Sequence, residues 1–183
     1  MWPLAVYVGL VLALFVRFGR PTHAPQPLRL EASAEDLRLV RRHQRAFYLL
    51  LLVSPIEWWL HGRSQGVVEI AAAAVFLAGL VGYRRAGRTL GPQLSPLVAP
   101  REPAVLAERG PYRRLRHPMY LAELAMAFAA PLMLGAYLSL TLAVAFATVV
   151  AQRIAAEERV LTERVPGYRD YAARTYRLVP YVY

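Results

Sequence analysis

Five long apolar segments, separated by charged stretches, set the pattern of the chain. They cover Trp2–Val16, Ala46–Leu60, Val67–Tyr83, Met119–Leu134 and Tyr137–Ala151. Each has about 15–17 residues, slightly fewer than the roughly 20 that a membrane span needs, and flanking residues supply the rest. A soluble bundle of buried helices is the alternative, but five such segments in 183 residues make it a poor explanation. The pattern therefore predicts an all-α integral membrane protein with about five transmembrane helices.

The arginines between the apolar segments predict the orientation of the chain in the membrane. Seven lie in loop 17–45, eight in loop 84–116 and six in the tail from residue 152 onward, whereas loop 61–66 has only Arg63. Positive charge favours the cytoplasmic side, so the N-terminus is expected outside and the C-terminus in the cytoplasm. The first apolar segment has no basic residues before it and no clear cleavage site, so we expect a retained helix rather than a signal peptide.

Composition narrows the function classes. The formal net charge is +10 and every basic residue is arginine, which is typical of a GC-rich, bacterial genome and hence of a bacterial inner-membrane protein. Nucleic acid is not expected as a partner, because the arginines lie between apolar segments, where they face an anionic lipid leaflet. There is no cysteine, and the four histidines lack the spacing of metal ligands, so no metal site is predicted.

The last two apolar segments predict a helical hairpin over residues 118–152. Only Leu134, Gly135 and Ala136 are left for the turn, so the two helices are expected to lie antiparallel as neighbours. This arrangement brings the residues before Met119 close to those after Ala151, at the cytoplasmic end. We therefore divide the chain into three N-terminal spans (1–87) and a C-terminal region (88–183) that carries the hairpin and a cytoplasmic helical tail.

The first candidate stretch is the segment from Arg109 to Tyr120, which leads into the hairpin. Pro118 suits the first turn of a helix, where its missing N–H costs nothing. His117 then lies at the helix entrance, where imidazole, arginines and free backbone N–H groups favour an anion. The alternative is a basic juxtamembrane segment with aromatic anchors that only ends the membrane span. For the arginines alone, this alternative is the simpler interpretation.

The second stretch runs from Arg153 to Arg159 and extends the last span into the cytoplasm. Arg153 and Glu157 are four residues apart and share a helix face. Glu157 and Glu158 point about 100° apart, so we expect one to face the bundle and the other to face water. A solvated charged helix is the alternative, but the hairpin should bring these carboxylates near His117.

Glu123 is the most unusual ionisable residue, because it lies inside the fourth apolar segment. An intramembrane carboxylate is costly and is a functional hypothesis by default. Its expected partners are Arg153, Arg116 or a bound cation.

The C-terminal region resembles the isoprenylcysteine carboxyl methyltransferase family and the related phospholipid methyltransferases. The resemblance covers roughly residues 88–181 and rests on Gly110-Pro111-Tyr112, on Arg116-His117-Pro118-Met119-Tyr120, on Glu157-Glu158 37 residues later, and on the tail from Gly167 to Pro180. One position departs from the family pattern: Ala122 stands where a glycine is usual.

The resemblance implies S-adenosylmethionine as methyl donor, with S-adenosylhomocysteine as product, and a lipophilic acceptor that enters from the bilayer. It implies that the cofactor is bound by Tyr112, Leu115, His117, Pro118, Tyr120, Glu157 and Glu158. Catalytic roles are expected for Arg116, Glu123 and Arg153. A carboxylate acceptor needs no base, whereas a phenol, thiol or amine must lose a proton, and Glu123 and His117 are the nearest candidates to take it.

Two other functions were weighed against this enzyme. A non-catalytic membrane protein that keeps the fold, such as an assembly or transport partner, is the main alternative. A small channel or transporter fits poorly, because the chain has neither an inverted repeat nor a pair of broken helices.

Overall fold

The computed structural model describes residues 2–18, 34–61, 66–98 and 105–180. Within these ranges the helices are α1 (Trp2–Phe18), α2 (Ala34–Leu60), α3 (Val67–Leu90), η1 (Gly91–Gln93), η2 (Gly110–Arg113), α4 (Pro118–Leu134), α5 (Leu140–Arg164) and α6 (Tyr168–Ala173). The described part of the chain has no β-strand beyond one isolated parallel bridge between Leu115 and Tyr176. The predicted all-α class is confirmed.

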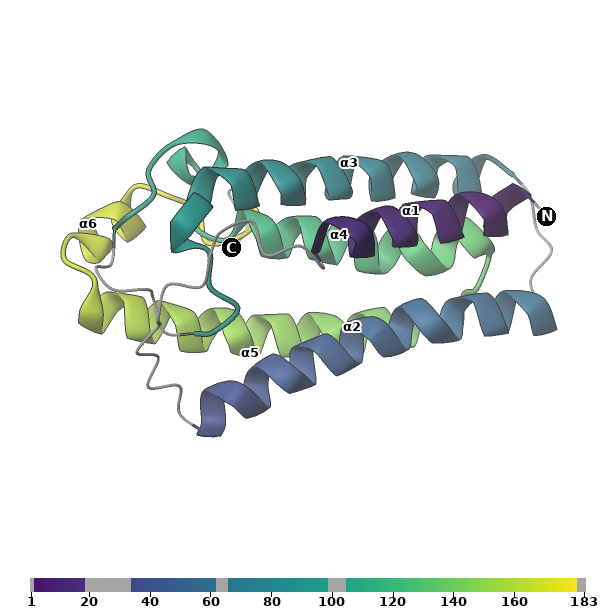
Figure 1. Cartoon of the computed structure of the whole chain (residues 1–183), viewed down its shortest axis with the longest axis horizontal. Coiled ribbons are helices and arrows are strands. Elements are labelled where there is room, and N and C mark those ends of the chain that lie inside the picture. The colour runs from purple at the N-terminus through teal and green to yellow at the C-terminus, as the bar shows by residue number, and fades with distance from the viewer. Residues whose placement is uncertain (1, 19–33, 62–65, 99–104, 181–183) are drawn as a thin grey trace.

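The five long helices lie side by side along the long axis of the molecule (Figure 1). The α4–α5 turn lies at the same end as the start of the chain, and α6 lies at the opposite end (Figure 1). The starts of α2 and α4 and the ends of α3 and α5 therefore share the α6 end. This juxtaposition unites the two charged stretches that the sequence singled out.

Two helices, α3 and α5, are long and apolar enough to cross a membrane by length and composition alone. Residues Pro3–Ala13 and the whole of α4 are apolar but shorter. The number of spans and their orientation therefore stay predictions.

Several helices extend beyond the predicted spans. Helix α2 runs unbroken from Ala34 to Leu60, so the second apolar segment and part of the arginine-rich loop before it form one helix. Helix α5 continues to Arg164, well past its apolar part, and carries the acidic stretch with it.

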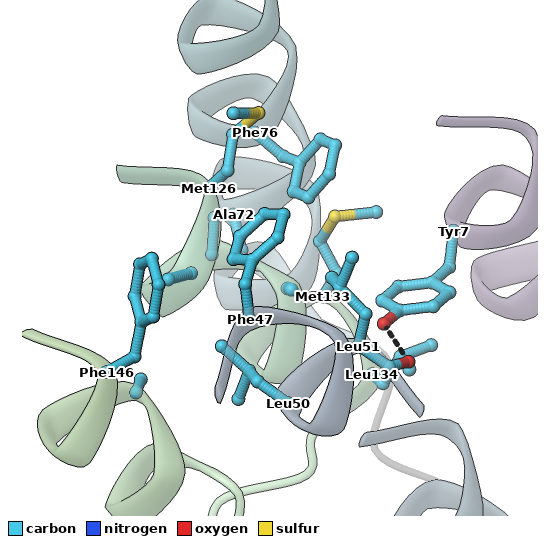
Figure 2. Packing of buried hydrophobic residues seen from close by; sticks show 14 of the residues in the cluster. Tyr7, Phe47, Leu50, Leu51, Ala72, Phe76, Met126, Met133, Leu134 and Phe146 are labelled. Carbon is cyan, nitrogen blue, oxygen red and sulfur yellow. Dashed lines mark hydrogen bonds between the residues drawn. The ribbon is translucent and has the colours of Figure 1, made fainter. Parts of the chain in front are cut away.

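The core is formed by apolar faces from all five long helices. Phe47 and Leu50 from α2, Phe76 from α3, Met126 from α4 and Phe146 from α5 meet at its centre, where they are almost fully buried (Figure 2). The hydroxyl of Tyr7 in α1 donates a 2.6 Å hydrogen bond to the carbonyl of Leu51 (Figure 2). These contacts fix the position of α4 and α5 relative to α2 and α3.

Helix α4 approaches α3 closely at Gly79. A Cβ placed there would lie 2.7 Å from Cγ of Met126 and 3.0 Å from the carbonyl oxygen of Ala122, so only glycine allows this approach. Ala122 itself faces α3, because a Cβ at Gly82 would lie 3.7 Å from its methyl group. The departure from the family glycine therefore fills space between two helices.

The hairpin turn is longer than the three residues expected from sequence. Helix α4 ends at Leu134, the cap residue Gly135 has a left-handed φ of 65°, and α5 begins only at Leu140. The carboxylate of Glu57 in α2 accepts hydrogen bonds from the backbone N–H groups of Leu138 and Ser139, at 2.8 and 2.7 Å, and from the Ser139 hydroxyl at 2.6 Å. The backbone N–H groups of Leu138 and Ser139 thus have their hydrogen-bond acceptor on α2. Helix α5 therefore starts after them, and Tyr137 lies in the turn.

Candidate functional site

The entrance to α4 is built by two tight turns. Gly110 opens η2 with a φ of 58°, where its missing Cβ leaves room for the side chain of Thr89. Pro118 then occupies the first position of α4 and His117 its N-cap, as predicted. This geometry orients the side chains of Arg116, His117 and Tyr120 from one short segment.

The C-terminal tail holds this segment through its backbone. The N–H groups of Arg116 and His117 donate to the carbonyls of Tyr176 and Arg177, at 2.8 and 3.1 Å, and Tyr176 N–H returns a bond to Arg114. The guanidinium of Arg116 also donates to the carbonyls of Ala172 and Thr175. The motif is therefore fixed by residues about 60 positions further along the chain.

Tyr171 of α6 adds a side-chain tie to the same segment. Its hydroxyl donates a 2.7 Å hydrogen bond to the carbonyl of Tyr112 and lies 3.3 Å from that of Leu115. Burial raises the pKa of Tyr171 to about 12, so the phenol stays protonated and can donate.

Glu158 is surrounded by cationic groups. Its Oε1 accepts a 2.6 Å hydrogen bond from Nε of Arg116 and lies 3.3 Å from Nε2 of His117. Its Oε2 lies 2.8 Å from Nε of Arg177, and the Tyr168 hydroxyl is 3.4 Å from Oε1. One carboxylate thus joins the α4 entrance, the tail and α6.

The charge state of Glu158 follows from these contacts. The residue lies beyond the apolar part of α5, with a side chain 13% exposed. Burial by itself raises the pKa of this carboxyl, but the hydrogen bonds from His117 and Arg116 outweigh burial and lower it to about 2. Glu158 is therefore ionised throughout the physiological range.

Glu157 forms a second centre one residue earlier. The hydroxyl of Tyr120 donates to Oε1, and Nε of Arg153 donates to the same oxygen at 3.1 Å. Arg153 also donates a 2.6 Å hydrogen bond to the carbonyl of Pro96, and its guanidinium carbon lies 5.6 Å from the Tyr120 ring centre. The expectation that one of the two glutamates faces water is wrong, because both are largely buried.

Glu123 lies one helical turn deeper along α4 than Tyr120, and its partner is His43 of α2. Nε2 of His43 is 3.2 Å from Oε2 of Glu123, within ion-pair distance but without hydrogen-bond alignment, so Oε2 counts as unsatisfied. The Nδ1 atom of His43 is buried and likewise has no hydrogen-bond partner. The ring packs edge-on against Phe146 and lies 5.9 Å from that of Tyr120. Among the described residues, the ion-pair partner of Glu123 is therefore this histidine and not the expected Arg153 or Arg116, although the charge of Glu123 still acts on Arg153.

The structure brings most of the predicted site residues together, some through their side chains and others through their backbone. Side chains that meet in the polar cluster are those of Arg116, His117, Tyr120, Arg153, Glu157 and Glu158. Tyr112 and Leu115 contribute backbone carbonyls to Tyr171, and Pro118 starts the helix. Glu123 pairs with His43 beside this cluster, and its charge also acts on Tyr120 and Arg153.

Four contributors were missed from the sequence. Arg177 and Tyr168 lie in the tail that resembles the family, so this resemblance is the sequence feature that could have identified them. Pro96 contributes a backbone carbonyl, which no side-chain pattern reveals. His43 is an isolated polar residue on the buried face of α2, and only the packing of α2 against α4 shows its role.

Comparison with known proteins defines the family. A family model described as phospholipid methyltransferase matches residues 68–167, which is more than half of the 183-residue chain. The chain therefore belongs to the phospholipid methyltransferase family, and the resemblance seen in the motifs is confirmed at this level. The family consists of methyltransferases, and the two long apolar helices agree with a membrane protein.

One curated protein is similar over most of the chain. It is the nickel-cobalt-cadmium resistance protein NccN of Alcaligenes xylosoxydans xylosoxydans, with 29% identity over 145 residues. The match covers 76% of this chain and 65% of that protein, so the chain spans less than two-thirds of the relative's length.

Proposed function

We propose that the protein transfers a methyl group from S-adenosylmethionine to a lipophilic acceptor that reaches the site from the bilayer. The observation that carries this proposal is the polar cluster at the α6 end of the bundle, where both carboxylates and guanidinium groups converge in a chain of a methyltransferase family. The acceptor class stays open between a prenylcysteine-like carboxylate, a lipid amine and a phenolic lipid.

The chemistry of the cluster fits this cofactor. S-adenosylmethionine has an amino-acid moiety with one ammonium and one carboxylate, and its sulfonium supplies the electrophilic methyl group. Nδ1 of His117 lies 3.8 Å from Oε2 of Glu157, beyond hydrogen-bond distance, so this oxygen has capacity to accept from an ammonium or a hydroxyl. Among the described residues, His117, Tyr120 and Glu157 would bind the polar end, with Tyr112, Leu115, Pro118 and Glu158 forming or fixing the walls.

The remaining residues have separate parts in this proposal. Arg116 fixes the tail against the α4 entrance, and Arg153 fixes the Glu157 carboxylate. Such positioning supplies much of the rate of an in-line displacement. Glu123, supported by His43, accepts the proton that an amine, phenol or thiol acceptor must lose, while a carboxylate acceptor transfers none.

We also propose the membrane arrangement that the arginines predict. Five spans would place the α6 end in the cytoplasm of a bacterial cell and the start of α1 outside the inner membrane. The N-terminal region (1–87) then covers the hairpin, and the region 88–183 binds the cofactor.

Binding of radiolabelled S-adenosylmethionine to the purified full-length chain tests the proposal. We expect saturable binding that is abolished in His117→Ala and in Glu157→Ala. Glu163→Ala, an exposed position on the same helix, is the matched control and should bind normally. Absence of saturable binding by the unaltered chain up to the low-millimolar range would falsify the enzyme reading.

The alternative is a non-catalytic role in metal resistance, which the name of the similar nickel-cobalt-cadmium resistance protein NccN favours. Cells that carry the His117→Ala variant separate the two. If metal tolerance depends on the protein and survives this substitution, the methyl-transfer proposal loses to the non-catalytic role.

A further inference from the structure

A groove of about 650 Å³ lies outside the polar cluster, between the end of α3 and η2. Arg84, Arg85 and Arg88 line it from α3, and Arg109 lines it from the segment before η2. The other lining residues are Val81, Thr89 and Gly110. Four guanidinium groups therefore surround one depression.

The charge of this groove is uncompensated within the described part of the chain. No carboxylate lines it, and none of its four arginines forms an ion pair with another described residue. Arg84 donates from Nη2 to the carbonyl of Ala13 at 2.7 Å, while its buried Nε has no hydrogen-bond partner. Clustered cations without counter-charge repel one another, so the groove is complementary to an anion.

An apolar stripe leads directly into the groove. Ile70, Leu77 and Val81 are at least half exposed and recur at helical spacing on one face of α3. Arg84, Arg85 and Arg88 follow Val81 at intervals of three, four and seven residues, so they continue the same stripe. An occupant of this surface therefore has an anionic end and a long apolar part.

We infer that this groove, here named the arginine groove, binds the headgroup phosphate of an anionic phospholipid whose acyl chains lie along Ile70, Leu77 and Val81. A free phosphate would use the arginines and leave the stripe uncovered. The lipid matches both features, and it places the phosphate at the end of α3 that the arginine distribution assigns to the cytoplasmic leaflet.

The arginine groove adjoins the candidate site through a short segment. Gly110 lines the groove and also begins η2, whose Tyr112 and the following Leu115 are tied to the tail by Tyr171. The inference does not depend on methyl transfer, because it concerns lipid binding alone.

The test measures thermal stabilisation of the purified full-length protein by dioctanoyl phosphatidylglycerol, with dioctanoyl phosphatidylcholine and inorganic phosphate in parallel. The test variant is the triple substitution Arg85→Gln, Arg88→Gln and Arg109→Gln, which removes only exposed side chains and leaves Arg84 in place. The matched control is Arg38→Gln, Arg41→Gln and Arg42→Gln, which removes the same charge from exposed positions on α2.

We expect phosphatidylglycerol to stabilise the unaltered protein and the control, and its apparent affinity to fall at least about tenfold in the groove variant. Phosphatidylcholine and inorganic phosphate should have little effect. Equal loss in both triple variants would reduce the effect to general charge attraction and overturn the inference. Equal stabilisation by inorganic phosphate would replace the lipid with a free anion, and an unchanged groove variant would exclude the site.

Discussion

Glu158 and Glu123 are carboxylates of neighbouring helices in one bundle, and their surroundings differ sharply. Glu158 has contacts with Arg116, His117, Arg177 and Tyr168 around its two oxygens. Among the described residues, Glu123 has one ion-pair partner, the buried His43, and an oxygen without an aligned donor. Against the effect of burial, the hydrogen bonds to Glu158 lower its pKa to about 2 and keep it ionised. Glu123 lacks such a set of donors among the described residues and keeps an oxygen that can still accept a hydrogen bond.

The comparison separates a carboxylate that organises the site from one that is available for chemistry. Glu158 links three segments distant in sequence, so its removal should disturb the whole site. Glu123 takes no part in the ion pairs that fix the tail against the α4 entrance, so its removal should leave those contacts in place. Four experiments test this division, from the largest expected effect to the smallest.

Glu158→Gln should have the largest effect. The amide keeps the shape of the side chain but leaves the cations of Arg116 and Arg177 without their counter-charge, at a cost of about 3 kcal/mol. We expect cofactor affinity to fall by roughly 100-fold or more, with faster amide exchange at Arg116 and His117. Titration with S-adenosylmethionine and hydrogen exchange measure both, with Glu163→Gln as control. An affinity within threefold of the unaltered protein would contradict the organising role.

Glu123→Gln should reduce turnover by roughly 100-fold while cofactor affinity changes little, because the proton acceptor is lost and the cofactor contacts remain. Single-turnover rates and cofactor titrations on the same sample measure the two quantities. His43→Gln and the double variant complete a cycle, in which the two substitutions should not add. Equal losses of turnover and affinity in Glu123→Gln would move this residue into the cofactor pocket.

Acid should destabilise the site through Glu158. Because the folded-state pKa is about 2 and the ordinary value is 4.5, this residue contributes stability above about pH 4.5, and the contribution is lost as the pH falls toward 2. Thermal unfolding in detergent between pH 6 and 3 measures the loss, which should be smaller in Glu158→Gln. Parallel curves for the two proteins would show that another group dominates.

Tyr168→Phe should have the smallest effect. Its hydroxyl lies 3.4 Å from Oε1 of Glu158, the longest contact of that carboxylate, while the ring packs with Val165 and Tyr171. We expect a loss of about 0.5–1 kcal/mol in unfolding free energy and less than a threefold change in cofactor affinity. A change as large as that of Glu158→Gln would make the phenol a principal partner of Glu158.

The sequence predicted those parts of the molecule that depend on local pattern. Apolar runs indicated the long helices, and the hairpin between α4 and α5 correctly brought His117 near Glu157 and Glu158. The start of α5 was placed three residues too early, because Glu57 of α2 binds the backbone before Leu140. Such a contact across helices has no signature in the residues around the turn.

The partner of Glu123 could not be predicted for a related reason. His43 is 80 residues from Glu123, and its approach depends on how α2 packs across α4 and α5. The side chains of His43 and Glu123 are both largely buried, and their contact is favourable because an unpaired charge in an apolar interior is costly. Periodicity identifies the buried face of a helix but does not say which residue of another helix will face it.

The bond between the tail and the α4 entrance has a consequence for biosynthesis. Arg116 and His117 are synthesised about 60 residues before the carbonyls of Tyr176 and Arg177 that bind their N–H groups. The hairpin can enter the membrane while these donors are still exposed to water. Closure of the site must wait until the segment around Tyr176 has left the ribosome, so the α4 entrance is fixed only after the whole hairpin has been synthesised.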